Sequence, residues 1–169
     1  MDFIQNFPFF SILLSLGSGV LTSIMNKKAA RLWNTFILVV ITVLSAVLFV
    51  YMLGVGKPYT FMMGHFPAPW GNEIRAGVLE AGMALFFCLI MLFSLKGGQD
   101  HIDAEIEDTK INLYYIMINL LLSSLLALIY TNDLFTAYVF VEINTISACG
   151  LIMITQNGRT IEAATRYMI

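Results

Sequence analysis

The segment TNDLFTAYVFVEINTISACGLIMI, from Thr131 to Ile154, is an apolar run long enough to cross a membrane, with a carboxylate near its middle. If Asp133 lies at one membrane surface, Glu142 lies about 13 Å deeper at the rise of an α-helix. That depth is close to the centre of a hydrocarbon core about 30 Å thick. A charged side chain there costs roughly 3 kcal/mol or more, so it must face protein or water. Glu142 is therefore a candidate functional residue, and we interpret the rest of the chain as its scaffold.

The composition indicates an all-α membrane protein. Of 169 residues, 59% are hydrophobic and 12% are charged, whereas a soluble domain is about half apolar and a quarter charged. The net charge of −2 and the lack of a basic face argue against nucleic-acid binding. Cys88 and Cys149 fall in apolar runs, which favours buried thiols over a disulfide. The sequence has no CxxC pair, histidine cluster or glycine-rich phosphate loop, so we expect no cofactor and no redox or hydrolytic site in this chain.

The pattern of apolar runs predicts one transmembrane domain over residues 1–169, with five spanning helices and the start of a sixth. The predicted spans are residues 7–25, 32–53, 72–95, 111–130 and 133–154, followed by a partial helix over 160–169. Met1 leads directly into the first run without a basic segment or a cleavage site. We therefore expect that run to be retained as a span.

The basic residues predict the orientation of these spans. With five spans, seven Lys and Arg fall on one side of the membrane and two, Lys57 and Arg75, on the other. The seven are Lys27, Lys28, Arg31, Lys96, Lys110, Arg159 and Arg166. Because cytoplasmic loops are enriched in these residues, we expect the amino terminus outside and the carboxyl terminus in the cytoplasm.

Two connecting segments lend themselves to specific predictions. Residues 54–71 are apolar for a loop, and we expect them to fold against the membrane surface or a neighbour as a short hairpin. We interpret His65 within them as an ordinary loop residue rather than a ligand or proton relay. Residues 96–110 are rich in Asp and Glu without the spacing of a calcium-binding EF-hand, which predicts a solvated loop. Docking of a soluble partner is the alternative.

Glu80 is a second acid inside a predicted span, one-third to one-half of the way along residues 72–95. One interpretation makes it a stop for a proton or a cation. The other makes it a carboxylate that is neutralised by protonation or paired with Arg75 near the interface. The sequence leaves both open.

Tyr138 and Thr145 share a helical face with Glu142, at spacings of four and three residues. Their hydroxyls are candidates to bond the carboxylate or a water beside it, and helix packing is the alternative. Cys149 continues the same stripe. Asn144 points away from Glu142, so we expect it to pack on another helix.

Three motifs resemble one known family. TNDLFTAYVFVEINTISACGLI, HFPAPWG before the third span, and EAATRYMI from Glu162 are similar to the antiporter-like subunits of Mrp cation/proton antiporters, especially the D-type chain. That family includes the proton-pumping membrane subunits of complex I and of group 4 membrane-bound hydrogenases. The resemblance is strong over residues 131–169 and moderate at Pro67 to Gly71. Elsewhere it is limited to the pattern of hydropathy.

The resemblance implies a role for Glu142, which matches the family's fifth-helix glutamate. In the family that glutamate pairs with a lysine on the seventh helix, which this sequence does not contain. Family members have about fourteen spans in two inverted repeats, as many transporters do. They often carry an acid just inside the third span, where this chain has Gly77. Without a countercharge, a buried carboxylate favours its protonated form.

The resemblance also implies partners. We expect other membrane subunits of a hetero-oligomeric complex in a prokaryotic cytoplasmic membrane, including a chain that supplies the remaining helices and the lysine partner of Glu142. A cytoplasmic redox arm is expected if that complex is a redox-driven pump rather than a sodium/proton antiporter. The alternative is a structural subunit with no transport path of its own.

Overall fold

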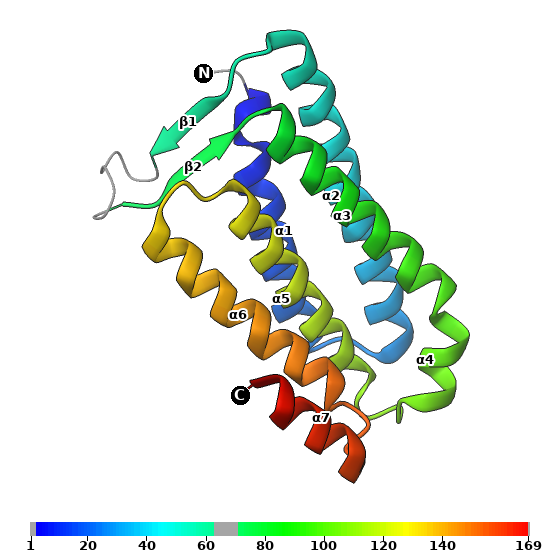
Figure 1. The fold of residues 1–169 in the computed structure, drawn as a ribbon. Coiled ribbons are helices and arrows are strands. Elements are labelled where there is room, and N and C mark those ends of the chain that lie inside the picture. Colours follow the sequence, from blue (N-terminus) through cyan, green and yellow to red (C-terminus); the bar gives the residue numbers. More distant parts are fainter. Residues whose placement is uncertain (1–2, 63–70, 169) are drawn as a thin grey trace.

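The computed structural model describes residues 3–62 and 71–168. In this part of the chain, long helices run side by side, with a β-hairpin at one end of the bundle and short helices at the other (Figure 1). The elements in chain order are the 3-10 helix η1 (Phe3–Asn6), α1 (Phe7–Thr22), α2 (Lys27–Val55), β1 (Tyr59–Met62), β2 (Glu73–Ala76), α3 (Val78–Gly97), α4 (Gln99–Glu105), α5 (Ile111–Tyr130), α6 (Leu134–Ile152) and α7 (Gly158–Met168).

Five helices of the described chain are long and apolar enough to cross a membrane, which confirms the predicted number of spans. They are α1 with η1, α2, α3, α5 and α6. The second begins at Lys27 rather than near Leu32, because lysine, alanine and arginine are good helix formers and extend the helix beyond its apolar part. It ends at Val55, and the following Gly56 has a φ of 66°, the left-handed conformation of a glycine cap.

Helix α5 lies at the centre and contacts α1, α2, α3 and α6. Tyr130 and Leu126 on α5 are almost fully buried, as are Ile41 and Met52 on α2. Helix α6, in contrast, packs mainly against α5 and α7, and most of its surface lies open. The scaffold therefore places α6 at the edge of the bundle (Figure 1).

A polar contact joins three helices in the interior. The Asn119 amide of α5 donates to Asn34 Oδ1 of α2 at 2.7 Å, and the Ser15 hydroxyl of α1 donates to the Asn119 carbonyl at 2.8 Å. The side chains of Asn34 and Asn119 are 2% and 3% exposed. Helix α1 lies close to α5 at Gly19, where a Cβ would just contact Asn119 Cβ at 3.4 Å. Small and polar residues thus hold α1 and α2 to α5.

A hairpin follows α2, with β1 antiparallel to β2 and Tyr59 opposite Ala76, but its second strand lies beyond the predicted segment 54–71. The hairpin is attached to the rest of the bundle at two points. The Tyr59 hydroxyl donates to the Gln5 carbonyl at 2.9 Å, and the Asn132 amide donates to the Glu73 carbonyl at 2.9 Å. His65 and most of the HFPAPWG motif lie outside the described residues.

The predicted start of the third span near Asn72 is wrong. Glu73 to Ala76 form strand β2, and the helix begins only at Val78. Alternate apolar residues of β2, Ile74 and Ala76, are buried, as expected for a strand with one face on a core. Because these residues are apolar, the strand resembles the first turns of an apolar helix in sequence.

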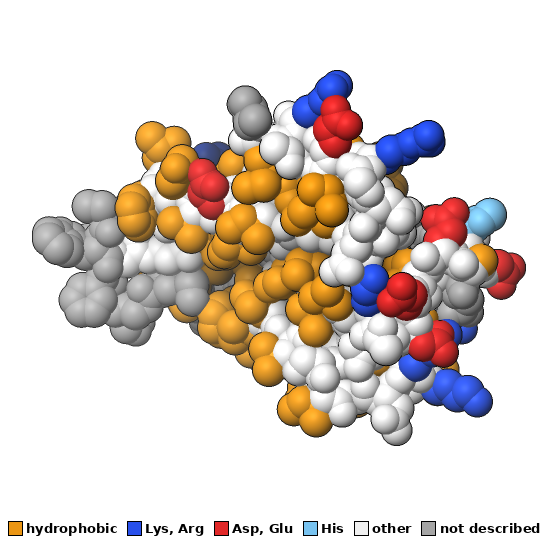
Figure 2. All heavy atoms as spheres, turned by 90° about the horizontal axis from the view of Figure 1, so that it is seen from below, with side chains coloured by type: hydrophobic (Ala, Val, Ile, Leu, Met, Phe, Trp, Pro, Cys, Tyr) orange, Lys and Arg blue, Asp and Glu red, His pale blue; other side chains and the backbone are white. Residues whose placement is uncertain are grey.

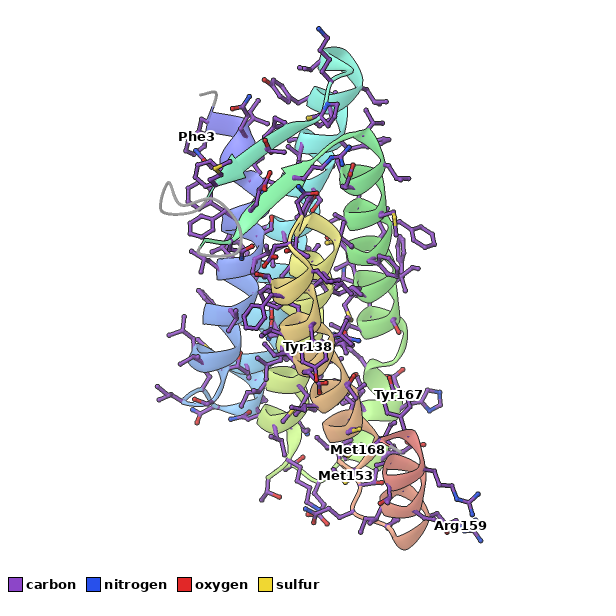
Figure 3. The ribbon with its side chains drawn as sticks, turned by 60° about the vertical axis from the view of Figure 1, so that its left-hand side comes forward. Phe3, Tyr138, Met153, Arg159, Tyr167 and Met168 are labelled. Atoms are coloured by element: carbon purple, nitrogen blue, oxygen red, sulfur yellow. The ribbon has the colours of Figure 1, made fainter. Side chains whose placement is uncertain are left out.

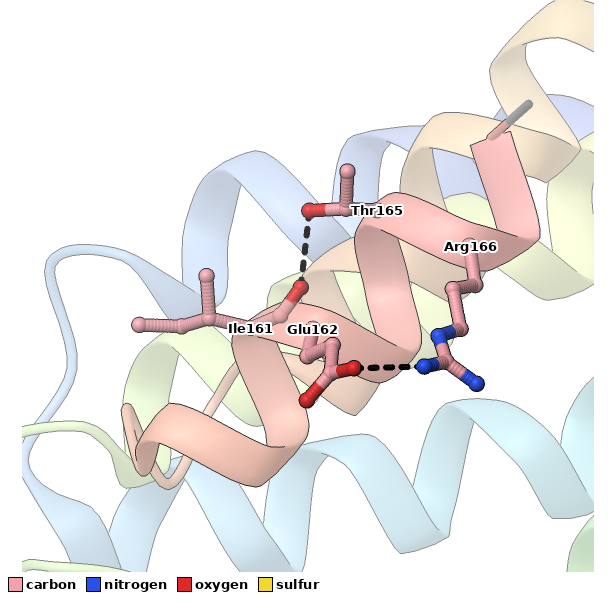
Figure 4. A network of polar contacts seen from close by, with 4 residues as sticks. All are labelled: Ile161, Glu162, Thr165 and Arg166. Carbon is pink, nitrogen blue, oxygen red and sulfur yellow. Dashed lines mark hydrogen bonds and ion pairs between the residues drawn. The ribbon is translucent and has the colours of Figure 1, made fainter.

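The opposite end of the bundle also has more helix than the sequence predicts. Residues 99–105 form helix α4 within the acidic segment, where the prediction of a loop is wrong. The predicted partial helix is present as α7, which begins at Gly158 and packs on α6. Within the EAATRYMI motif, Arg166 Nη2 pairs with Glu162 Oε1 at 2.6 Å, one helical turn apart (Figure 4).

Candidate functional site

Asp133 fixes the start of α6, the helix that carries Glu142. Its carboxylate accepts hydrogen bonds from the Thr136 hydroxyl at 2.7 Å, the Thr136 amide at 3.0 Å and the Phe135 amide at 3.4 Å. These bonds satisfy amides that the first turn of a helix leaves free. The bond from the Thr136 hydroxyl contributes most to lowering the pKa of Asp133 below its ordinary value. Asp133 therefore caps α6 as a carboxylate.

Glu142 lies near the middle of α6, about 12 Å from its first residue at the helical rise. Its side chain is exposed in this chain. The Tyr138 hydroxyl lies within hydrogen-bonding reach of the Glu142 carboxylate one turn away. Figure 3 shows Tyr138 on α6, at the front of the bundle. The predicted pair is thus together, on a side of α6 that α5 does not cover.

The surroundings of Glu142 on this side are apolar. We call this surface the open face of α6; its exposed members are Leu134, Phe135, Tyr138, Val141, Glu142 and Ile146. Part of it is hollowed, with Tyr138 among the lining residues. Phe135 is 70% exposed and Tyr138 is 63% exposed. Apolar side chains of this kind suit lipid or another helix, whereas the carboxylate among them suits only protein or water.

Thr145 and Cys149 lie differently from Tyr138. The Thr145 hydroxyl donates to the Val141 carbonyl of its own helix at 2.9 Å, so only its oxygen lone pairs remain for Glu142. Cys149 is buried, although it continues the same stripe. As expected, Asn144 faces a neighbouring helix: the Ser124 hydroxyl of α5 lies 3.4 Å from Asn144 Oδ1.

Glu80 lies in the first turn of α3, not one-third to one-half of the way along a span. The predicted depth is wrong because β2 occupies residues that the sequence suggests are helix. Glu80 Oε1 lies 3.9 Å from Arg75 Nε, and the two side chains are 25% and 49% exposed. This is the paired arrangement near the interface that the sequence offers as an alternative.

The structure does not bring Glu80 and Glu142 together. Helix α5 lies between α3, which carries Glu80, and α6, which carries Glu142 (Figure 1). A Cβ at Gly77 would lie 2.6 Å from Glu80 Oε2, so the glycine leaves the space that this carboxylate occupies. Gly77 is the position where the resembling family often has an acid. Glu80 brings a carboxylate against that position from the following turn.

The interior contact among Asn34, Asn119 and Ser15 is only partly predictable. Polar residues within 111–130, Asn119 among them, are of the kind that bonds across helices. The sequence does not identify their partners, because α1 offers several small polar residues, Ser11, Ser15, Ser18 and Thr22, and nothing local shows which of them meets Asn119. In the described residues, no group of three or more His, Cys, Asp or Glu is arranged to hold a metal ion.

Comparisons with known proteins find relatives of one kind, named as subunits of larger assemblies. No family model matches the chain. Over 114 residues, 68% of this chain, it is 30% identical to NADH-quinone oxidoreductase subunit N of Desulforudis audaxviator (strain MP104C), of which it covers 22%. Over 98% of its length it is 25% identical to the D-type chain of the Na(+)/H(+) antiporter of Bacillus subtilis (strain 168), of which it covers 33%.

A solved structure shows the same fold. A chain in the structure of the membrane-bound sulfane sulfur reductase, an archaeal respiratory membrane complex, matches with a TM-score of 0.83 over 98% of this chain, at 23% identity. The match covers 33% of that chain. This chain therefore spans between 22% and 33% of the length of these relatives.

Proposed function

Because this chain belongs, by sequence and by fold, with the antiporter-like membrane subunits, we propose that it is one membrane subunit of a multisubunit ion-translocating complex. In this proposal Glu142 holds a proton or pairs with a cation on the transport path. Helices outside Met1–Ile169 complete that path. The whole assembly is either an Mrp-type sodium/proton antiporter module or a complex I-like or hydrogenase pump.

The observation that carries this proposal is the place of Glu142. Its side chain is exposed on an apolar face, near the middle of a helix of membrane-spanning length. A carboxylate at that depth is not stable against lipid tails. Since only protein or water suits it, we infer that another helix covers the open face of α6 in the assembly. A cation on that helix would offset the cost of desolvating the carboxylate.

A movable cation would give Glu142 two states. With the cation close, the ionised carboxylate is favoured; with it withdrawn, the protonated acid is favoured. The neighbouring hydroxyls would favour opposite states. Tyr138 can donate to a carboxylate, whereas Thr145, whose hydrogen is bonded to Val141, can only accept from the acid. Each time the cation withdrew and returned, Glu142 would then bind and release one proton.

The proposed setting is the cytoplasmic membrane of a prokaryote. The connection at residues 23–26, helix α4 and helix α7 lie at one end of the bundle (Figure 1). This end carries the seven basic residues that we expect on the cytoplasmic side. In this proposal the chain carries no cofactor, and any redox chemistry belongs to a cytoplasmic arm formed by other subunits.

The test is Glu142→Gln in the intact complex, followed by ion transport in inverted membrane vesicles. We expect a loss of roughly 100-fold or more, the scale on which a proton-transferring group contributes, and partial retention in Glu142→Asp. Glu105→Gln, at an exposed position on α4, is the matched control. Proton and radioactive sodium fluxes in the same vesicles would identify the ion.

The structural-subunit hypothesis gives a different result. In that case Glu142→Gln leaves transport unchanged, whereas a charge placed on the open face, such as Val141→Lys, prevents assembly. Co-purification of the remaining subunits, identified by mass spectrometry, separates lost assembly from lost transport. Normal flux in an assembled Glu142→Gln complex would end the proposal of a transport role.

A further inference from the structure

A mostly apolar cavity of about 170 Å³ lies beneath the β-hairpin, and the proposed function does not use it. Its walls come from four elements: Phe9 and Leu16 on α1, Ile74 on β2, Ala127 on α5 and Phe140 on α6. Helices α1 and α6 both pack on α5, so the cavity lies between α1 and α6, with the small side chain of Ala127 at its back. The fold therefore leaves a space of molecular size beside α5.

The end of the cavity toward the hairpin is polar. Asn72, which directly precedes β2, and Thr131, which directly follows α5, both line the cavity. Asn72 Oδ1 is buried and has no hydrogen-bond partner among the described residues. The Thr131 hydroxyl lies 3.5 Å from both the carbonyl oxygen and the amide nitrogen of Asp133, too far for strong hydrogen bonds. Because buried polar atoms in folded proteins are paired in the large majority of cases, this end suits a bound molecule that supplies a donor.

The other end of the cavity is apolar and extends toward the middle of the bundle. Helices α1 and α6 both begin at the hairpin end (Figure 1), and Leu16 lies about 10 Å further along α1 than Phe9. Leu13 and Leu16 are 49% and 37% exposed, so the cavity is open on this side. Hydrophobic side chains cover much of the face that Figure 2 shows, as expected for contact with lipid. A molecule dissolved in the bilayer can therefore reach the cavity from the membrane.

We propose that this cavity binds a small amphipathic molecule with a hydroxyl head, such as a phenol or a short alcohol. The hydroxyl would donate to Asn72 Oδ1 and accept from Thr131, and the apolar body would lie between Leu16 and Phe140. An apolar cavity of about 150 Å³ already takes benzene, so the volume here suits one ring or a short chain. The bound molecule would connect α1 to α6, the helix that carries Glu142.

The test uses the full chain, purified in mild detergent and titrated with para-fluorophenol or para-fluorotoluene while fluorine NMR measures binding. The two compounds have nearly the same shape, and only the phenol has a hydroxyl. We expect saturable binding of the phenol, about fivefold tighter than that of the toluene, which is the effect of one neutral hydrogen bond. The preference should disappear in Asn72→Leu, which replaces the amide by an apolar group of similar size. Ala127→Leu should abolish saturable binding of both compounds, because it fills the cavity from the back.

The matched controls make the same substitutions outside the cavity. Asn132→Leu, at an exposed position near the hairpin, and Ala163→Leu, at an exposed position on α7, should bind both compounds as the wild type does. Equal affinity of the wild type for the two compounds would overturn the proposal and leave the cavity to water or lipid. Unchanged binding in Ala127→Leu would place the compounds elsewhere. If Ala127→Leu fails to fold, Leu16→Trp fills the same cavity from its open edge.

Discussion

Single carboxylates in this chain have roles that depend on their hydrogen-bond partners. Asp133 is held by donors from Thr136 and Phe135 and serves as a helix cap. Glu80 lies beside an arginine near a membrane surface. Glu142 has a tyrosine hydroxyl within reach and lies on an apolar face. Of the three, Glu142 is the one whose surroundings require a partner from outside the chain.

Asp133→Ala should loosen the first turn of α6. Removing the cap exposes the Phe135 and Thr136 amides, so their hydrogen exchange should accelerate roughly three- to tenfold, the range expected for a lost cap. Asp133→Asn, which keeps an acceptor, is the control and should exchange nearly as the wild type does. Unchanged exchange in Asp133→Ala would show that the contact with β2 alone holds this end.

The Asp133 cap also predicts that the stability of the first turn of α6 depends on pH. The pKa of Asp133 is lowered in the folded chain, chiefly by the Thr136 hydroxyl. A lowered pKa stabilises the fold above the unfolded value, and this contribution is lost as the pH falls through the folded value. Amide exchange at Thr136 should therefore show extra acceleration only below about pH 4. In Asp133→Asn that extra step should be missing.

At the scale of the helix, the polar contact between α2 and α5 can be measured. We predict a favourable coupling of about 0.6 to 1.7 kcal/mol between Asn34→Ala and Asn119→Ala in a double-mutant cycle of unfolding in detergent. The reason is their direct side-chain bond of 2.7 Å between buried amides. Ser123→Ala should not couple to Asn34→Ala, because the Ser123 hydroxyl bonds Leu120 of its own helix. Additive effects of the two Asn changes would contradict the contact.

The sequence predicts the five long helices because hydropathy is a local property of a helix. The strand β2 is not predicted because its pairing with β1 is made across the intervening residues 63–72, which no local window detects. The consequence is the wrong depth for Glu80. The depth of Glu142 depends on a run without such an interruption, so its place near the middle of a helix agrees with the structure.

The open face of α6 cannot be predicted from the sequence. The apolar residues of α6 are spread around the whole helix, so their pattern does not identify the side that packs on α5. Only the tertiary contacts show that the side with Tyr138 and Glu142 lies outward. The functional role of Glu142, Tyr138 and Thr145 remains a prediction.

At the scale of the whole molecule, the orientation can be tested by cysteine labelling. Both native cysteines, Cys88 and Cys149, are buried, so the wild type should react little with a membrane-impermeant maleimide. We expect Lys57→Cys to be labelled in intact cells. Arg159→Cys should be labelled only after the membrane is permeabilised, because α7, which carries Arg159, lies at the opposite, more basic end of the bundle. If Arg159→Cys were labelled in intact cells, the predicted orientation would be wrong and the chain would lie the other way round in the membrane.

The length of α2 has a consequence for the surrounding lipid. Its apolar part, residues 32–55, is about 36 Å long, whereas the 19 residues of α6 reach about 28 Å. A bilayer is stretched beside a long span and compressed beside a short one, at a fraction of a kcal/mol per Å. Because α2 and α6 belong to one bundle, the bilayer around the chain would be thicker beside α2 and thinner beside α6. Lipid compressed beside α6 relaxes when a neighbouring protein replaces it, so membrane elasticity would favour assembly on the side that carries Glu142.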